Sequence, residues 1–158
     1  MRNETVLRDY RATDLEPMFQ LDEDCFEEEF RFDRESMREF AEEQNSIVRI
    51  AENACGEIAG FVIVHVERVR QGWRAYVVTL DVAAAYRQKG LATRLMSDVE
   101  ASLMAAGVQW MQLHVFTGNM NAIRFYERMG YERMSMQREF YGESGLDAFV
   151  YGKELSPL

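Results

Sequence analysis

The loop Arg87-Gln88-Lys89-Gly90-Leu91-Ala92 has the residue types and the surroundings expected of a phosphate-binding site. The preceding run from Trp73 to Val82 is apolar and β-branched, which is typical of a buried strand. From Leu91 onward, apolar residues recur at helical spacing. Because the first N–H groups of a helix have no partner within it, and the helix dipole is positive there, such a loop binds phosphate through its main chain. With two cations, Arg87 and Lys89, the loop predicts a site for a phosphorylated cofactor.

Other motifs for nucleotide, metal or serine-hydrolase chemistry are absent from the sequence. It contains no G-x-x-x-x-G-K-[ST] loop, no G-x-G-x-x-G fingerprint and no G-x-S-x-G elbow. The only histidines are His65 and His114, and the only cysteines are Cys25 and Cys55. Their spacings match no metal site and no disulfide framework, so we expect no metal ion.

A second motif begins about 30 residues after the loop, at Asn119, and reads N-M-N-A-I-R-F-Y-E-R-M-G-Y. The pair of motifs resembles the GNAT superfamily of acetyl-CoA-dependent N-acetyltransferases, and in particular bacterial ribosomal-protein alanine (N-terminal) acetyltransferases. The loop matches the family pattern Q/R-x-x-G-x-G/A, with Ala92 at the last position, and the later motif matches N-x-x-A-x-x-F/L-Y-x-x-x-G-F/Y. The resemblance covers about residues 46–154; residues 1–45 agree in the order of elements only.

The resemblance implies acetyl-CoA as the cofactor and assigns a role to each matching position. Backbone groups of Leu80 and Val82 would pair with the pantetheine arm as an added strand. Asn119 would contact the same arm, and Tyr126 would be the general acid that protonates the departing thiolate. The pyrophosphate would be held by the loop and the start of the helix, namely Arg87, Gln88, Lys89, Gly90, Leu91, Ala92 and the Thr93 hydroxyl.

Two of these candidate side chains also have ordinary structural explanations. Tyr126 belongs to an apolar helical stripe with Ala122, Phe125 and Met129, and could be a core residue. His114 lies on the less apolar face of the strand Trp110–Phe116, where similar enzymes often carry a glutamate that acts as a base. It is our candidate base, with a hydrogen-bonded structural histidine as the alternative.

The amine acceptor is the least defined part of the sequence. One wall of the acceptor groove in family members corresponds to the stretch that holds Phe26, Glu29, Phe30 and Phe32. The other wall corresponds to Tyr141, with Phe140 before it. The same aromatic residues could instead close the hydrophobic core. An α-amine with a pKa near 7.8 is partly neutral at physiological pH, whereas a lysine amine near 10.4 requires a strong base. A single histidine, or a water chain to Glu29 or Asp81, therefore favours an α-amine.

Acidic residues are concentrated in one segment of a chain whose net charge is −9. Residues 14–43 contain 13 acidic and three basic residues, whereas the other residues carry 14 acidic and 15 basic ones. This distribution disfavours nucleic acid as a partner and suits a cationic substrate, although solvated helix faces would produce it too. The N-terminus lacks a secretory apolar core, and no apolar run approaches the roughly 20 residues that span a bilayer. We expect no membrane partner and a reduced, cytoplasmic setting.

The order of apolar patterns predicts an α/β fold in a single domain over residues 1–158. Strands are expected at 5–10, 46–53, 57–69, 73–82, 110–116, 131–141 and 146–154, and helices at about 13–26, 34–43, 91–106 and 119–129, the first opened by a capping box from Thr13 to Glu16. Such an order gives a mixed, mostly antiparallel sheet with helices on both faces.

We expect this domain to transfer acetyl from acetyl-CoA to an amine by direct attack, with a protein or peptide N-terminus as acceptor. Neither cysteine has the position of a nucleophile. The alternatives are an enzyme for small amines (a polyamine, an amino acid or a drug) and a non-catalytic acyl-CoA-binding regulatory domain. Family members often pair through their last strands, so the resemblance also allows a homodimer.

Overall fold

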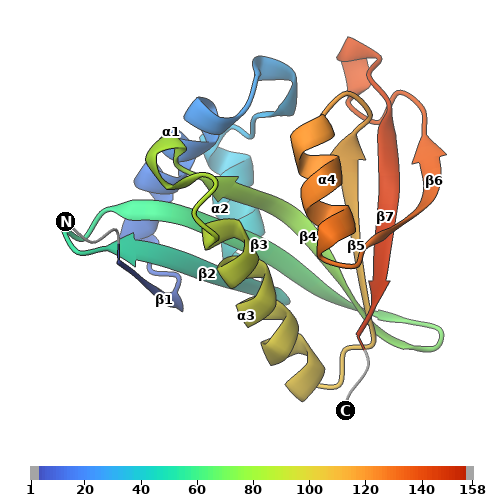
Figure 1. Cartoon of the computed structure of the whole chain (residues 1–158), viewed down its shortest axis with the longest axis horizontal. Helices are drawn as coiled ribbons and strands as arrows, with labels where there is room; N and C mark the ends of the chain where they lie inside the picture. Colours follow the sequence, from blue (N-terminus) through green and yellow to red (C-terminus); the bar gives the residue numbers. More distant parts are fainter. Residues whose placement is uncertain (1–3, 156–158) are drawn as a thin grey trace.

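The computed structural model describes residues 4–155, and its element order is the predicted one (Figure 1). The strands are β1 (Thr5–Asp9), β2 (Ser46–Asn53), β3 (Ile58–Val69), β4 (Gly72–Val82), β5 (Trp110–Phe116), β6 (Glu132–Gln137) and β7 (Ala148–Glu154). The helices are α1 (Leu15–Cys25), α2 (Arg34–Glu42), α3 (Leu91–Ala105) and α4 (Met120–Arg128), with short 3-10 turns between elements.

All of these strands join one sheet, in the order β1-β2-β3-β4-β5-β7-β6. Every neighbouring pair is antiparallel except β4 and β5, which are parallel. The predicted mixed, mostly antiparallel sheet is therefore confirmed. A parallel pair needs a long crossover connection, and α3 provides it between β4 and β5.

Helices cover both faces of the sheet, as predicted, and each face has its own core (Figure 1). Leu95, Val99 and Leu103 of α3 pack on the same face as residues of α4, against apolar side chains of β3, β4 and β5. On the other face, α1 and α2 contribute Met18, Leu21, Met37 and Ala41 to a second core with β2 and β3.

The parallel pair β4 and β5 separates soon after it begins. The ladder joins Arg74–Tyr76 to Trp110–Gln112 and ends there, while β4 continues along β3 and β5 continues along β7. A bulge shifts the β3–β4 register between Ile63 and Val64, which increases the local twist. Beyond Tyr76 one edge of β4 therefore has no strand partner in the described part of the chain.

The capping box predicted at Thr13 is wrong. A 3-10 turn, Ala12–Asp14, precedes α1, and the Asp14 carboxylate accepts the Arg11 N–H at 2.7 Å. Asp14 also binds the Arg8 guanidinium at 2.8 Å, so a charged, largely buried acceptor takes the place expected for the Thr13 hydroxyl. The carboxylate of Glu16 instead pairs with Arg34 of α2.

The last hairpin has a longer connection than the sequence predicted. Strand β6 ends at Gln137 rather than at residue 141, because Glu139 adopts a left-handed conformation with φ 52° that interrupts the strand. The loop then makes a 3-10 turn at Gly142–Ser144 before β7. Residues 138–147 therefore form an excursion beside the sheet instead of continuing it.

Helix α4 is fixed at its start by the asparagine of the second motif. The Asn119 side chain accepts the Ala122 N–H at 3.2 Å, which satisfies one of the free donors of the first turn. Met120–Arg128 is only nine residues long, so its orientation depends on this cap and on the burial of Ile123 and Tyr126.

Replacing Asn119 with Ala is expected to lower the free energy of unfolding by about 1 kcal/mol, because the cap is lost. Chemical denaturation measures the change. Asn121→Ala is the matched control: Asn121 is exposed in the first turn of α4 and caps nothing, so its replacement should leave stability unchanged or slightly higher. Equal losses in the two variants would contradict the capping role.

Candidate functional site

The first turn of α3 offers unpaired N–H groups to solvent. The first intrahelical bond runs from the Arg94 N–H to the Gly90 carbonyl at 3.0 Å, so the N–H groups of residues 91–93 have no partner within the helix. Gly90 and Gln88 adopt left-handed conformations, with φ 82° and 61°, that turn the chain into the helix. No acidic residue lies in this first turn. The loop residues Arg87, Gln88, Lys89 and Gly90 are exposed. The predicted anion site therefore combines unpaired helix N–H groups with an exposed loop, and its binding of phosphate stays a prediction.

The unpaired edge of β4 leads directly into this loop. The Ala83 N–H donates to Ala59 on β3, which by strand alternation turns the backbone groups of Leu80 and Val82 toward the unpaired edge. The Val82 carbonyl accepts the Arg87 Nε–H at 3.0 Å and the Cys25 thiol at 3.4 Å. Burial raises the pKa of the Cys25 thiol to about 11, so the thiol stays protonated at neutral pH, which fits a hydrogen-bonding role and not a nucleophile.

Tyr126 is a core residue and also a member of the candidate site. Its side chain is only 8 % exposed and packs against Phe125 and Tyr131 with centroid distances of 5.1 and 5.6 Å. Burial raises its pKa, and electrostatic interaction with Asp81, Tyr141 and Tyr76 raises it further. The two explanations considered from the sequence are thus compatible.

His114 is hydrogen-bonded at both ring nitrogens. Its Nδ1 lies 2.8 Å from the Tyr76 hydroxyl, and its Nε2 lies 2.9 Å from Oε1 of Gln137. The Phe140 ring stacks on the imidazole at 3.9 Å, with only 5° between the planes. Because the Gln137 amide oxygen can only accept a hydrogen bond, Nε2 carries the hydrogen and Nδ1 accepts a hydrogen bond from the Tyr76 hydroxyl. Burial lowers the pKa of His114, so the ring is neutral at pH 7.

The sequence did not indicate Tyr76 as a site residue. The register of the β4–β5 pair places it there. Tyr76 pairs with Gln112 at the end of the parallel ladder. His114 lies two residues beyond Gln112 on the same face of β5, so the two side chains meet across the separating strands. Burial raises the pKa of Tyr76 to about 12, and the phenol is therefore protonated and able to donate.

An aromatic cluster connects the loop after α1 to the loop before β7. Phe30 lies 5.1 Å from Phe116 and 4.7 Å from Tyr141, centroid to centroid. Tyr141 in turn packs edge-on against Phe140, at 4.9 Å. The cluster therefore contains residues from both predicted walls of the acceptor region. Phe30 is the residue of the first wall that contacts the second.

The other residues predicted for the first wall lie outside this cluster. Phe32 packs against Phe40 at 5.1 Å and joins the core between α1 and α2. The Phe26 carbonyl accepts from Arg31, and Glu29 is exposed within a 3-10 turn, Glu28–Phe30. Their part in acceptor binding stays a prediction. The sequence showed Phe26, Phe30 and Phe32 among acidic residues, and this pattern did not distinguish Phe30 from the other two.

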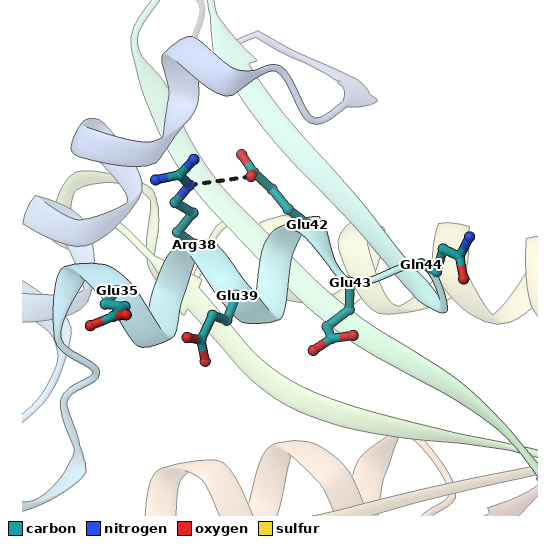
Figure 2. A pocket seen from close by; sticks show the side chains of 6 residues that line it. All are labelled: Glu35, Arg38, Glu39, Glu42, Glu43 and Gln44. Atoms are coloured by element: carbon teal, nitrogen blue, oxygen red, sulfur yellow. Dashed lines mark hydrogen bonds and ion pairs between the residues drawn. The ribbon is translucent and has the colours of Figure 1, made fainter.

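A shallow hollow on the outer side of α2 is separate from these features (Figure 2). Most of the side chains that line it are acidic. One of these carboxylates, that of Glu42, forms an ion pair with Arg38. The lining residues are Glu35, Arg38, Glu39, Glu42, Glu43 and Gln44. None of them belongs to the aromatic cluster or to the α3 N-terminus, so this hollow is not the candidate site.

In residues 4–155 no group of three or more His, Cys, Asp or Glu side chains is arranged to hold a metal ion.

A separating parallel strand pair, a free helix N-terminus and a buried tyrosine on the next helix define the class of acyl-CoA-dependent transferases that the motifs predicted. The chain belongs to the acetyltransferase (GNAT) family, whose model matches residues 15–131. The resemblance stated from the sequence is confirmed.

Several known proteins are similar to this chain. The catalytic subunit NAA10 of the Arabidopsis thaliana N-terminal acetyltransferase A complex is 29% identical over 111 residues, which are 69% of this chain and 57% of that protein. The structure of A. thaliana NAA60 in complex with acetyl-CoA has a TM-score of 0.84 at 23% identity, covering 96% of this chain and 99% of that one. The ribosomal-protein-S18-alanine N-acetyltransferase from Escherichia coli has a TM-score of 0.84 at 21% identity, covering 98% and 96%.

These similarities define the family and the fold. The two structural matches are distant in sequence, so they concern the architecture alone. The chain spans less than two thirds of the length of the curated relatives it matches first. Among the described helices, none has the length and apolar character needed to cross a membrane.

The burial of His114 leads us to predict a lowered pKa in a titration experiment. Because burial lowers its pKa, the histidine resonance followed by NMR should titrate with a midpoint below about 6.5, the ordinary value. The unfolded chain then takes up this proton before the folded protein does, so this site contributes a loss of stability as pH falls through 6.5. His114→Gln assigns the resonance and should reduce the acid-side loss. A midpoint above 6.5 would contradict the neutral, hydrogen-bonded ring.

Proposed function

We propose that this protein is an acetyl-CoA-dependent N-acetyltransferase whose acceptor is the α-amine of a protein or peptide N-terminus. The observation that carries the proposal is the hydrogen-bonded Tyr76–His114 pair at the point where β4 and β5 separate. The unpaired edge of β4 leads from there to the free N–H groups of α3, and Tyr126 is buried on α4. A site for phosphate alone would not need a protonated phenol and a neutral imidazole at the same place.

The residues present fit acetyl-CoA on both parts of the cofactor. The N–H groups of residues 91–93 and the exposed loop before them would hold the pyrophosphate, with Thr93 exposed in the same turn. The backbone groups of Leu80 and Val82 on the unpaired edge of β4 would pair with the pantetheine arm. Arg87 would release the Val82 carbonyl on binding. Asn119 already caps α4, so any contact with the arm would use its amide N–H groups. The cofactor supplies an activated acetyl group.

The chain supplies a proton acceptor at one side of the reaction and a proton donor at the other. The Tyr76 hydroxyl donates to His114 Nδ1, so its oxygen can accept a proton from an incoming amine while its own proton passes to the imidazole. Tyr126 stays protonated because burial raises its pKa, and in the described residues its hydroxyl has no hydrogen-bond partner. It would give its proton to the departing sulfur.

A neutral histidine with a depressed pKa is a weak base, which suits an α-amine better than a lysine amine. The water chains considered from the sequence are less favourable: Asp81 is 1 % exposed and faces α1, away from Leu80 and Val82, and Glu29 is on the outer surface. The relatives named as catalytic subunits of N-terminal acetyltransferases support the same acceptor class.

A small amine is the second candidate acceptor. Phe30 touches both Phe116 and Tyr141, so the two aromatic walls already meet, and a compact acceptor would disturb them less than a peptide. The non-catalytic alternative is weaker, since cofactor binding alone does not require Tyr76, His114 and Tyr126 together. A cytoplasmic setting, with both cysteines as free thiols, and one catalytic domain are further parts of the proposal, and a homodimer is left open.

Replacing Tyr126 with Phe is expected to lower kcat by roughly a hundredfold or more, because the general acid is lost. The dissociation constant for CoA, measured by calorimetry, should change little, since the ring remains in the core. Tyr10→Phe is the control: its hydroxyl bonds to Glu42 between β1 and α2, outside the site, so kcat should be retained. An unaltered kcat in Tyr126→Phe would remove this residue from the mechanism.

The acceptor class is tested by a panel of amines assayed for CoA release. Peptides with free N-termini should be acetylated in preference to the same peptides blocked at the N-terminus and carrying an internal lysine, because the base is weak. Free polyamines and amino acids form the third arm. Preferential turnover of that arm would select the second candidate. CoA binding with no turnover in any arm would favour the regulatory alternative.

A further inference from the structure

Two buried carboxyl groups face each other beneath the candidate site. Asp22 of α1 and Asp81 of β4 are 0 % and 1 % exposed. One oxygen of each has a donor: Asp22 Oδ2 accepts the Phe32 N–H at 2.9 Å, and Asp81 Oδ1 accepts the Thr79 hydroxyl at 2.5 Å. Asp22 Oδ1 and Asp81 Oδ2 are buried and have no donor among the described residues. Helix α1 packs against β4, and each of the two carboxyl groups is close enough to change the pKa of the other.

This arrangement is unstable if both groups are charged. Two carboxylates offer only acceptors to each other, and each buried oxygen without a donor carries a free-energy penalty. Repulsion between adjacent carboxylates in a buried site adds to it. A single proton removes the lack of a donor, the unsatisfied oxygens and the repulsion together. One carboxyl group then donates a hydrogen bond to the other, and both remaining oxygens are satisfied.

We propose that Asp22 and Asp81 share one proton, and that the resulting hydrogen bond is a positioning device that holds the acceptor wall at the loop after α1 against the cofactor strand. The bonds on either side connect the pair to the acceptor wall and to the cofactor strand. Asp22 fixes the backbone of Phe32, two residues after Phe30, which contacts Tyr141. Asp81 lies between Leu80 and Val82 on β4. The acceptor role of the wall rests on the proposed function; the shared proton does not.

The charged surroundings favour a single negative charge on the pair. Burial raises the pKa of Asp81 well above its usual range, and the neighbouring Asp22 raises it further. Burial likewise raises the pKa of Asp22. Arg87 faces Asp81, and Arg31 and Glu23 face Asp22; the two arginines stabilise one charge on the pair. The remaining titratable neighbours of Asp81, Cys25 and Tyr126, keep their protons at neutral pH.

The pair is placed for positioning and not for direct proton transfer from the acceptor. Asp81 points toward α1, opposite to Leu80 and Val82, whose side chains pack in the core on the α3 face. The carboxyl groups are covered by protein, whereas Tyr76 and His114 lie on the aromatic side where the acceptor is expected. Loss of the shared bond should therefore weaken acceptor binding before it affects the chemical step.

The direct test is infrared spectroscopy of the whole protein at neutral pH. The wild type should show the carbonyl stretch of a protonated carboxylic acid, and Asp22→Asn and Asp81→Asn should both lack it. An asparagine amide supplies the missing donor without a shared proton. Asp24→Asn is the matched control, since Asp24 is exposed on the same helix and should leave the band unchanged. A wild type without the band would overturn the inference, whatever its activity.

The same proton makes stability depend on pH in a defined direction. The folded protein keeps it to a higher pH than the unfolded chain, whose carboxyl groups ionise near pH 4. Stability from this site is therefore complete below pH 4 and declines as pH rises toward the pKa of the pair, by up to about tenfold in the unfolding equilibrium constant per pH unit. Asp22→Asn should show a shallower decline in thermal and chemical unfolding than the wild type or Asp24→Asn. Identical slopes would contradict a shared proton.

Kinetics tests the positioning role. Asp22→Ala removes both the pair and the bond to Phe32, so KM for a peptide acceptor should rise about tenfold or more, with kcat reduced less. Asp22→Asn keeps an acceptor for the Phe32 N–H and should raise KM less. An unchanged KM in a folded Asp22→Ala protein would remove the positioning role. If no amine is acetylated by the wild type, the proposed function fails, while the infrared band and the pH slopes still decide the shared proton.

Discussion

The separation of β4 from β5 is the constraint on which the rest of the site depends. The parallel ladder ends at Tyr76 and Gln112, and each strand then follows its other neighbour, β3 or β7. A strand edge without a partner carries free N–H and C=O groups, which is ordinarily a liability. Here the edge lies inside the molecule and continues into the α3 N-terminus, so the fold provides extended backbone donors and acceptors next to an anion site. The separation also lets Tyr76 and His114 meet from two strands.

Electrostatics at the site is set more by burial than by net charge. The chain carries −9, and most of that excess lies between residues 14 and 43. Part of this acidity is internally compensated, because Asp14 pairs with Arg8 and Glu16 pairs with Arg34. The titratable groups around the candidate site are neutral: burial holds the protons on Tyr76, Tyr126 and Cys25, and keeps His114 uncharged. A neutral, partly water-excluded centre strengthens each hydrogen bond made there.

The sequence predicted the order of elements along the chain, the helix layers and the loop that precedes α3 because those features depend on local patterns. Hydrophobic periodicity located β4 and α3, and the two motifs identified the start of α3, Asn119 and Tyr126. The missing parts depend on register and on contacts between distant segments. Tyr76 became recognisable only from its pairing with Gln112, and Asp22 only from its approach to Asp81 across the α1–β4 contact. The Thr13 capping box failed for a related reason, since Arg8 of β1 determined which oxygen was available at the start of α1.

The loop between β6 and β7 supplies Phe140 to the imidazole of His114 and Tyr141 to the acceptor wall, and the last residue of β6, Gln137, binds the imidazole nitrogen. Under the proposed function, changes of length or sequence in this hairpin would alter two properties at once: which acceptors fit, and how basic the ring is. During divergence within the family, a new acceptor preference acquired through this loop would bring a new pH profile with it. Acceptor selectivity and the proton affinity of the His114 imidazole would then change together.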